Sequence, residues 1–353
     1  MLDRLNKLKE NMASLGLDGL VVTDRADVFY LSGLESSNCL LLISSKNLLL
    51  TDSRYILAAQ CAQGHFEIRE VNASLEKEAG ALIKELGLKR VGVQDMSLSL
   101  AAYMELSDGA QGQFLPVGEM LKEQRAVKDE SELDAIRRAQ NITDGAFRKL
   151  LDYIKPGISE TDIACELEYI KRKSGADGLA FETIAAAGIN GAKPHAQPGE
   201  YKLRAGDMLT LDFGAKKDGY CSDMTRTVSV GEPPEELKKI YTIVLDAHNR
   251  AKELLRPGAG TREIDSAARS YIEAQGYGKY FGHGLGHGAG IEIHELPVLS
   301  YRRESELCPG NVVTIEPGIY VPGLGGVRIE NMCFITESGY EDITRSDNNL
   351  IIL

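Results

Sequence analysis

Short apolar runs alternate with amphipathic segments along the N-terminal part of the chain. Four apolar runs have the length that is typical of buried strands: 19–23, 39–43, 48–51 and 90–94. Periodic apolar residues predict an amphipathic helix at the start of the chain and two more helices over about 53–63 and 74–86. We therefore predict an α/β unit over residues 1–125.

A polar, charged stretch follows this unit. Residues 121–130 read LKEQRAVKDE, a composition that favours a linker. A long helical pattern begins after it, at about Ser131. We place a domain boundary here, so that the second domain covers residues 126–353.

The second domain contains a faint internal repeat. Residues 204–214 and 308–318 share the pattern Gly-[Asp/Asn]-apolar-apolar-Thr-apolar-[Asp/Glu]-x-Gly at an offset of 104 positions. Two shorter pairs recur in the same order, at offsets of 101 and 99: Lys155-Pro-Gly with Arg256-Pro-Gly, and His195-Ala-Gln-Pro with His294-Glu-Leu-Pro. Each half is therefore predicted to be a helix pair followed by antiparallel strands, with an acid, Asp212 or Glu316, at the same point.

Composition narrows the class of protein. The chain has 353 residues and a formal net charge of −12, which argues against a nucleic-acid partner. No apolar run approaches the roughly 18 residues of a membrane span. The six cysteines form no Cys-x-x-Cys pair, and the N-terminus has no secretory signal pattern. We expect a cytoplasmic protein that binds no membrane.

Acidic residues occur on two predicted hairpins. In the first, strand patterns flank a turn over 214–219, and a turn centred between residues 217 and 218 would place Asp212 opposite Asp223. Two ionised carboxylates on directly opposed residues repel each other, so a positive group must lie between them. Arg226 is one candidate for this group. The alternative is a solvated turn with ordinary surface acids.

The second predicted hairpin also carries two acids on otherwise apolar strands. Strand patterns over 311–316 and 327–336 flank a glycine-rich connection, and they carry Glu316 and Glu330. Alternation places Arg328 on the same face as Glu330, which on its own favours a structural ion pair. Four acids in one cavity would carry more charge than one arginine neutralises. Two divalent cations, about 3.5–4 Å apart and bound by the carboxylates and one imidazole, would balance them.

Histidines cluster between the two acidic hairpins, ahead of the acids of the second half. Three of the six histidines, His283, His287 and His294, lie within residues 281–297 among five glycines. The order and spacing of the acids and of His283-Gly-Leu-Gly-His287 resemble the pita-bread metallopeptidases. Gly325-Gly-Val-Arg-Ile-Glu330, His294-Glu-Leu-Pro297 and the N-terminal domain are similar to the Xaa-Pro-cleaving branch, which contains prolidase and aminopeptidase P.

The resemblance implies a fold and a set of roles. The expected fold class is α+β: a pita-bread catalytic domain with a pseudo-two-fold internal repeat, preceded by an α/β creatinase-like domain. The implied metal ligands are Asp212, Asp223, His287, Glu316 and Glu330. Glu316 is also expected to shuttle a proton, His195 and His294 to contact the scissile carbonyl region, and His283 to line the proline pocket. Arg328 either orients Glu330 or reaches a substrate carboxylate, and both roles stay open.

Two further interpretations concern residues beside and outside these motifs. Tyr220 and Thr225 flank Asp223 and are either partners of the ligands or ordinary strand residues. His65 and His248 lie outside the motifs and are interpreted as core or surface histidines.

The implied function is hydrolysis of the peptide bond preceding proline, by a hydroxide held between two divalent ions. Mn or Co is favoured, with Zn or Fe as alternatives, and the expected substrates are Xaa-Pro dipeptides or short peptides with proline in second position. The resemblance also implies a homodimer. Creatinase-like amidinohydrolase chemistry and a non-catalytic binding role on the same fold are the alternatives, and methionine aminopeptidase is disfavoured by the N-terminal domain. His294-Glu-Leu-Pro favours dipeptides, although the choice between dipeptidase and aminopeptidase stays open.

Overall fold

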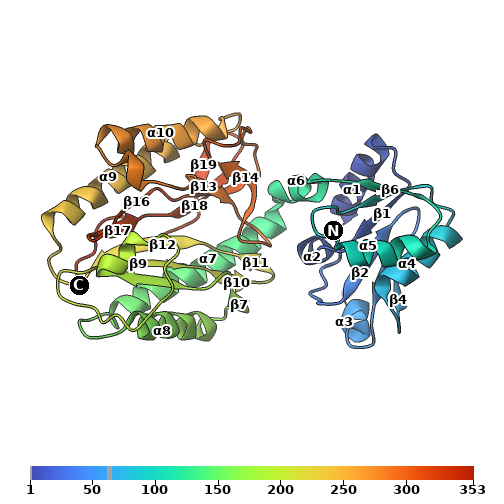
Figure 1. The fold of residues 1–353 in the computed structure, drawn as a ribbon, viewed down its shortest axis with the longest axis horizontal. Helices are drawn as coiled ribbons and strands as arrows, with labels where there is room; N and C mark the ends of the chain where they lie inside the picture. Colours follow the sequence, from blue (N-terminus) through green and yellow to red (C-terminus); the bar gives the residue numbers. More distant parts are fainter. Residues whose placement is uncertain (1, 62–65) are drawn as a thin grey trace. The chain divides into compact units, whose positions relative to one another are not determined.

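The computed structural model describes residues 2–61 and 66–353, and the chain divides into two compact units, Met1–Arg125 and Ala126–Leu353. Figure 1 shows their elements. Among the described helices, none is long and apolar enough to cross a membrane.

The N-terminal unit is built on one six-stranded sheet in the order β4-β3-β2-β1-β5-β6. Its strands are β1 (Gly19–Val22), β2 (Cys39–Ile43), β3 (Asn47–Thr51), β4 (Glu67–Glu70), β5 (Arg90–Val93) and β6 (Gln113–Pro116). Its helices are α1 (Leu2–Ser14), α2 (Arg25–Ser32), α3 (Ile56–Cys61), α4 (Leu75–Glu85), α5 (Leu100–Gly109) and α6 (Met120–Ala126). The four predicted strands are confirmed as β1, β2, β3 and β5, and the three predicted helices as α1, α3 and α4.

The predicted linker over 121–130 is wrong, because most of it is helical. Helix α6 covers Met120–Ala126, and the Arg125 guanidinium is buried in an ion pair with Asp27, with Nη1 2.7 Å from Oδ1. The sequence alone does not distinguish an arginine that is buried in an ion pair from one that is exposed to solvent. The charged stretch was therefore interpreted as a linker, and the helix was missed. The long helix was predicted correctly: α7 (Glu130–Leu151) begins at a capping box between Asp129 and Glu132.

The C-terminal unit consists of two related halves. The first half contains α7, α8 (Glu160–Lys173), β7 (Gly178–Leu179), β8 (Ile184–Ala187), the 3₁₀ turn η1 (Gly188–Ala192), β9 (Met208–Phe213), β10 (Ala215–Lys217), β11 (Tyr220–Cys221) and β12 (Met224–Ser229). The second contains α9 (Glu235–Lys252), α10 (Thr261–Ala274), the 3₁₀ turn η2 (Gly278–Tyr280), β13 (Gly286–Gly288), β14 (Glu295–Leu299), β15 (Val312–Ile315), β16 (Gly318–Val321), β17 (Gly325–Arg328), β18 (Asn331–Ile335) and β19 (Tyr340–Asp342). Each half is therefore a helix pair followed by antiparallel strands, as the repeat predicts.

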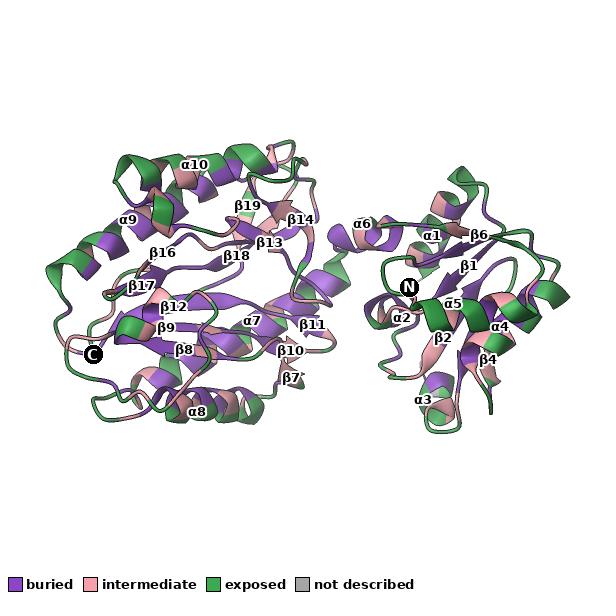
Figure 2. Cartoon of the chain, in the orientation of Figure 1, coloured by how far each residue is buried: buried purple, intermediate pink, exposed green. Residues whose placement is uncertain are grey.

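The two helix pairs lie on opposite sides of the strands, so that the sheets form the middle of this unit (Figure 1). One apolar cluster joins α7 and α8 to β8, β9 and β12, through residues such as Phe147, Leu167 and Leu211. Another joins α9 and α10 to β15–β18, through residues such as Val244, Ile272 and Ile315. Figure 2 shows the result: most of the inner strands are buried, and the helices expose one face to solvent.

The first acidic hairpin has a different register from the predicted one. Its turn is Asp218–Gly219, both with positive φ (51° and 82°), so Lys217 pairs with Tyr220. Asp-Gly is favoured in two-residue hairpin turns because both central positions need positive φ. The turn is centred one position later than expected, and the residue opposite Asp212 is therefore Thr225, not Asp223.

The second acidic hairpin is interrupted beside its two acids. The pair β15–β18 ends at Ile315 and Asn331, and the pair β16–β17 starts at Gly318 and Arg328, so part of the predicted glycine-rich connection is strand. At the interruption, the Glu330 N–H donates to Thr225 O of the first half at 3.1 Å. The two halves are thus joined where their acids meet.

Candidate functional site

One cavity of about 930 Å³ in the C-terminal unit collects all the residues that the sequence singled out as site residues. They are His195, Asp212, Asp223, His283, His287, His294, Glu316, Arg328 and Glu330. The acids come from the two hairpins, and three of the histidines come from the segment that contains β13. The remaining one, His195, lies on the loop that follows η1. The repeat therefore brings distant parts of the chain to a single site.

The glycines around His287 serve close contacts between backbones. A Cβ atom at Gly286 would lie 2.0 Å from Thr314 O, and one at Gly288 would lie 2.1 Å from Leu296 O. Only glycine fits such distances, so β13 can lie tightly between β14 and β15. This packing fixes the backbone that carries His287.

The acids and His287 converge closely. His287 Nε2 lies 3.3 Å from Glu316 Oε1 and 3.7 Å from Asp223 Oδ2. Potential ligand atoms of Asp223, His287 and Glu330 all lie within 4.8 Å of one another. Asp212 Oδ1 and Asp223 Oδ1 are buried and have no hydrogen-bond partner among the described residues. Buried carboxylate oxygens without donors are costly, and divalent cations would satisfy them.

The pKa shifts of the acids and of His287 are consistent with a site that binds cations. Burial, followed by repulsion from Glu330, raises the pKa of both Asp223 and Glu316 well above the usual range. Burial, followed by repulsion from Asp212, raises the pKa of Glu330 to about 8. Burial lowers the pKa of His287 to about 4, so its imidazole is neutral at pH 7. His287 Nδ1 donates to Gly288 O at 3.0 Å, which leaves the Nε2 lone pair directed at the acids.

These shifts predict that divalent cations displace protons from the site. At pH 7 a carboxyl group with a pKa of about 8 is mostly protonated, and a cation can bind only the deprotonated form. Apparent affinity for Mn²⁺ should therefore increase as the pH rises from 6 to 8. Calorimetric titrations in two buffers with different ionisation enthalpies should report proton release at pH 7. Equal enthalpies in the two buffers would contradict the prediction.

The buried Arg328 compensates part of the negative charge of the acids, whereas Arg226, the candidate considered from the sequence, does not lie between them. Arg328 Nη2 donates to Asp212 Oδ2 at 2.6 Å, and Arg328 Nε donates to Thr225 Oγ1 at 3.1 Å. Thr225 Oγ1 in turn donates to Glu330 Oε2 at 2.7 Å. The suggestion that Arg226 lies between the acids is wrong, because its guanidinium binds the Asn331 side chain and backbone carbonyls.

Of the two residues that flank Asp223, Thr225 contacts the acids, since its hydroxyl donates to Glu330 Oε2. The Tyr220 hydroxyl donates instead to Glu132 Oε1 of α7 at 2.9 Å. Tyr320 is a site residue that the sequence did not reveal. Its hydroxyl accepts from Arg328 Nη1 at 2.8 Å and donates to His283 Nε2 at 2.9 Å. It lies on β16, in residues 317–320, for which the sequence pattern predicted no element.

The other histidines surround the cluster in different environments. The half-buried His283 ring lies edge-on to Phe281, with ring centroids 5.0 Å apart, and desolvation lowers its pKa to about 4. The His294 ring lies 4.4 Å from that of His287, and the residue is exposed to solvent at the cavity. His248 is fully buried in α9 and does not line the cavity. His65 lies outside the described residues.

Known proteins resemble this chain along its whole length. Residues 134–337 match the model of metallopeptidase family M24, and residues 4–127 match the creatinase/prolidase N-terminal domain. The uncharacterized peptidase YqhT of Bacillus subtilis is 42% identical over 99% of this chain and 100% of its own. Among solved structures, the Xaa-Pro dipeptidase from Bacillus anthracis is 39% identical, with a TM-score of 0.97 over 100% of this chain and 99% of that chain. The X-Pro aminopeptidase from Thermotoga maritima is 37% identical, with a TM-score of 0.90 over 96% and 98%.

Proposed function

The chain belongs to metallopeptidase family M24, and on that premise we propose that it is a dinuclear peptidase that hydrolyses the peptide bond preceding proline. The predicted family and fold class are confirmed: a pita-bread C-terminal unit with an internal repeat follows a creatinase-like N-terminal unit. The proposed substrates are Xaa-Pro dipeptides and short peptides with proline in second position.

The observation that carries this proposal is the group of four carboxylates and one neutral imidazole around a single cavity. Asp212, Asp223, His287, Glu316 and Glu330 would hold two divalent cations, and the orphan oxygens of Asp212 and Asp223 fit that role. When bound, such a pair supplies a hydroxide nucleophile near neutral pH and polarises the attacked carbonyl. Oxygen-rich ligation favours Mn or Co, and it also accepts Fe or Zn.

Protein side chains would move the proton and stabilise developing charge. Glu316, whose pKa is raised by burial, accepts a proton from the attacking water and delivers it to the proline nitrogen as the C–N bond breaks. His294 and His195 would donate hydrogen bonds to the oxyanion that forms at the carbonyl. Each such donor typically contributes about 2.7–4 kcal/mol to transition-state stabilisation.

Selection of proline would depend on shape. The proline nitrogen has no N–H to donate, and its ring fixes φ, so a rigid wall can recognise it by fit. His283 is held rigidly, because its Nδ1 donates to Gly284 O at 2.8 Å while its Nε2 accepts from Tyr320. We assign this ring as one wall of the proline pocket.

A substrate panel tests the proposal. The purified protein is stripped with EDTA, reloaded with Mn²⁺ or Co²⁺, and assayed on an Xaa-Pro dipeptide, an Xaa-Pro-Yaa tripeptide and a Met-Ala peptide. We expect no hydrolysis after stripping, recovery on reloading, and cleavage of the dipeptide at least as fast as of the tripeptide. Hydrolysis that is indifferent to chelation would overturn the metallopeptidase mechanism. A strong preference for the tripeptide would instead favour the aminopeptidase activity named for the Thermotoga maritima relative.

A further inference from the structure

The loop that carries His195 begins and ends at the same carboxylate. Residues 188–198 leave β8 and return to the N-terminus of α8, and five consecutive residues, 194–198, line the cavity. We propose that Glu160 is a positioning residue that closes this segment into a rigid loop and so sets the place of His195 beside the acidic cluster. The catalytic part of this inference rests on the proposed function, and the structural part does not.

Glu160 contacts both ends of the loop. Its Oε1 accepts from the Ala187 N–H at 2.7 Å, just before the loop, and its Oε2 accepts from the Gly199 N–H at 3.1 Å, just after it. Asn190 Nδ2 lies between the two oxygens, at 3.1 and 3.3 Å. Glu160 is only 1% exposed, so these donors replace the water that an ionised carboxylate would otherwise bind. One side chain thus holds together two points that are separated by eleven residues.

The contacts are not those of an ordinary acid at the start of a helix. Such acids stabilise the helix by lying near its free N–H groups. In α8 that role belongs to Ser159 and Asp162, which form a reciprocal capping box. The Glu160 oxygens accept hydrogen bonds from the loop and its flanks, and Glu160 does not line the cavity. Its influence on the site must therefore pass through the loop.

Further along, the loop contacts β17, whose Arg328 donates to Asp212. A Cβ atom at Gly326 of β17 would lie 2.0 Å from Gly191 O, so the backbones of η1 and β17 are in close contact. Pro194 O accepts from Arg328 Nη1 at 3.3 Å, one residue before His195. Joining the two ends of a loop lowers the conformational entropy that is lost when the rest of the loop becomes ordered. The contacts at Gly191 and Pro194 then have less entropy cost to offset. With Glu160 in place, the contacts with β17 and Arg328 are therefore expected to keep the loop in a single conformation.

Hydrogen exchange of the metal-free protein tests the structural part. In Glu160→Gln one oxygen becomes an amide donor that faces a backbone N–H, so one end of the loop is released. We expect at least one of the amides of Ala187 and Gly199 to exchange about tenfold faster or more, which corresponds to the loss of one charged hydrogen bond. Asp162→Asn, in the same helical turn, is the matched control and should leave these amides unchanged. Unchanged exchange in Glu160→Gln would overturn the proposal.

A double-mutant cycle tests the catalytic part with the metal-loaded enzyme and an Xaa-Pro dipeptide. Glu160→Gln should lower kcat about tenfold, and it should have no further effect once His195→Ala is present, because both changes remove the same positioned imidazole. Additive losses would overturn the link to His195. Glu160→Asp keeps the charge but is too short to reach both ends, so it should reproduce the loss even if the glutamine variant folds poorly. Absence of Xaa-Pro hydrolysis in the unaltered enzyme would refute the proposed function alone, since the exchange result stands apart from it.

Discussion

Replacing Glu316 by glutamine is expected to lower kcat for an Xaa-Pro dipeptide by about 10⁴-fold, the largest catalytic loss of any single substitution in the chain. Glutamine has nearly the same shape, but it cannot take up and return a proton. It also removes one of the charges that would bind a cation, 3.3 Å from His287 Nε2. The two roles are lost together, whereas His294 and His195 would each contribute one hydrogen bond.

The measurement separates these two roles by counting metal. Steady-state kinetics are compared with the metal content of the same Glu316→Gln sample, and activity is repeated at saturating Mn²⁺. A variant that regains two metals and remains inactive identifies Glu316 as the proton carrier. Glu337→Gln, an exposed acid of the same unit, should match the unaltered enzyme. Retention of more than a tenth of the activity by Glu316→Gln would contradict its assignment.

Replacing Arg328 by methionine should produce the largest loss of stability in the metal-free protein, about 3–5 kcal/mol in the free energy of unfolding. The guanidinium is 4% exposed and donates to Asp212, Thr225, Tyr320 and Pro194 O. Without it the acids lose their buried counter-charge. Because the native state raises the pKa of Glu330 to about 8, ionisation destabilises the fold as the pH rises from about 4.5 toward 8. The loss in Arg328→Met should therefore be larger at pH 8 than at pH 5.

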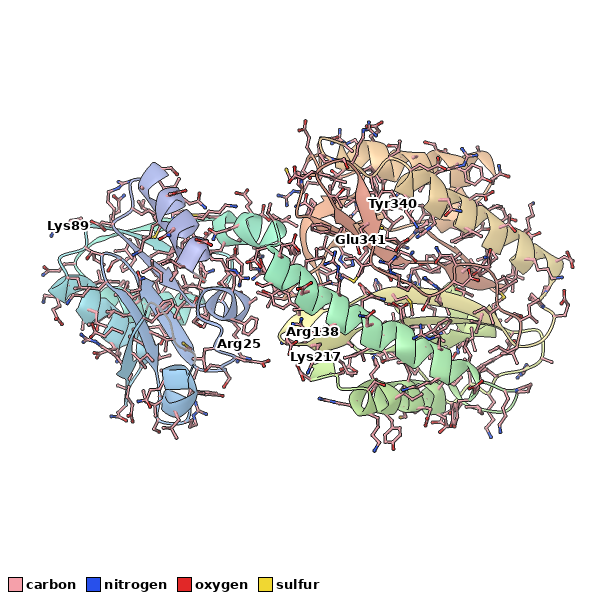
Figure 3. All side chains as sticks on the ribbon, turned by 180° about the vertical axis from the view of Figure 1, so that it is seen from behind. Arg25, Lys89, Arg138, Lys217, Tyr340 and Glu341 are labelled. Atoms are coloured by element: carbon pink, nitrogen blue, oxygen red, sulfur yellow. The ribbon has the colours of Figure 1, made fainter. Side chains whose placement is uncertain are left out.

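Denaturant titrations at the two pH values, with and without Mn²⁺, check this expectation. Mn²⁺ should restore more stability to Arg328→Met than to the unaltered protein, since added cations replace the missing charge. Arg138 is a suitable control, because it forms an exposed ion pair with Asp218 on the outer face of α7 (Figure 3). Arg138→Met should change stability by less than about 1 kcal/mol. Equal losses in the two variants would show that Arg328 does not compensate the acids.

The sequence predicted those parts of the fold in which burial follows a local pattern. Apolar strands such as β2 and β3 are buried nearly throughout, and the repeat predicted two halves of the same construction. Strands β4 and β6 were missed because their outer residues are exposed and their sequences are not strongly apolar. Helix α6 was missed because its buried arginine finds a partner almost 100 positions away, which no local pattern reveals.

The sequence predicted which acids and histidines line the cavity, but it missed Tyr320 and predicted the geometry only in part. The acids and histidines stand out because ionisable residues are rare on apolar strands. The register of the first hairpin depended on a single turn, and Asp218–Gly219 shifts it by one position. Alternation could have excluded Arg226, which is three residues from Asp223 and so points to the other face of its strand. Glu160 has no such signal, since its importance arises from contacts with a loop 27 to 39 positions away.

The seam between the halves, where the Thr225 hydroxyl and backbone carbonyl bind Glu330 across 105 positions of sequence, has a consequence for biosynthesis. A ribosome delivers Asp212 and Asp223 long before it delivers His287, Glu316 and Glu330. Until translation passes residue 330, the growing polypeptide lacks at least one of the four acids. A chain that is still being synthesised therefore cannot assemble the complete set of acids before its last acidic strand segment has been made.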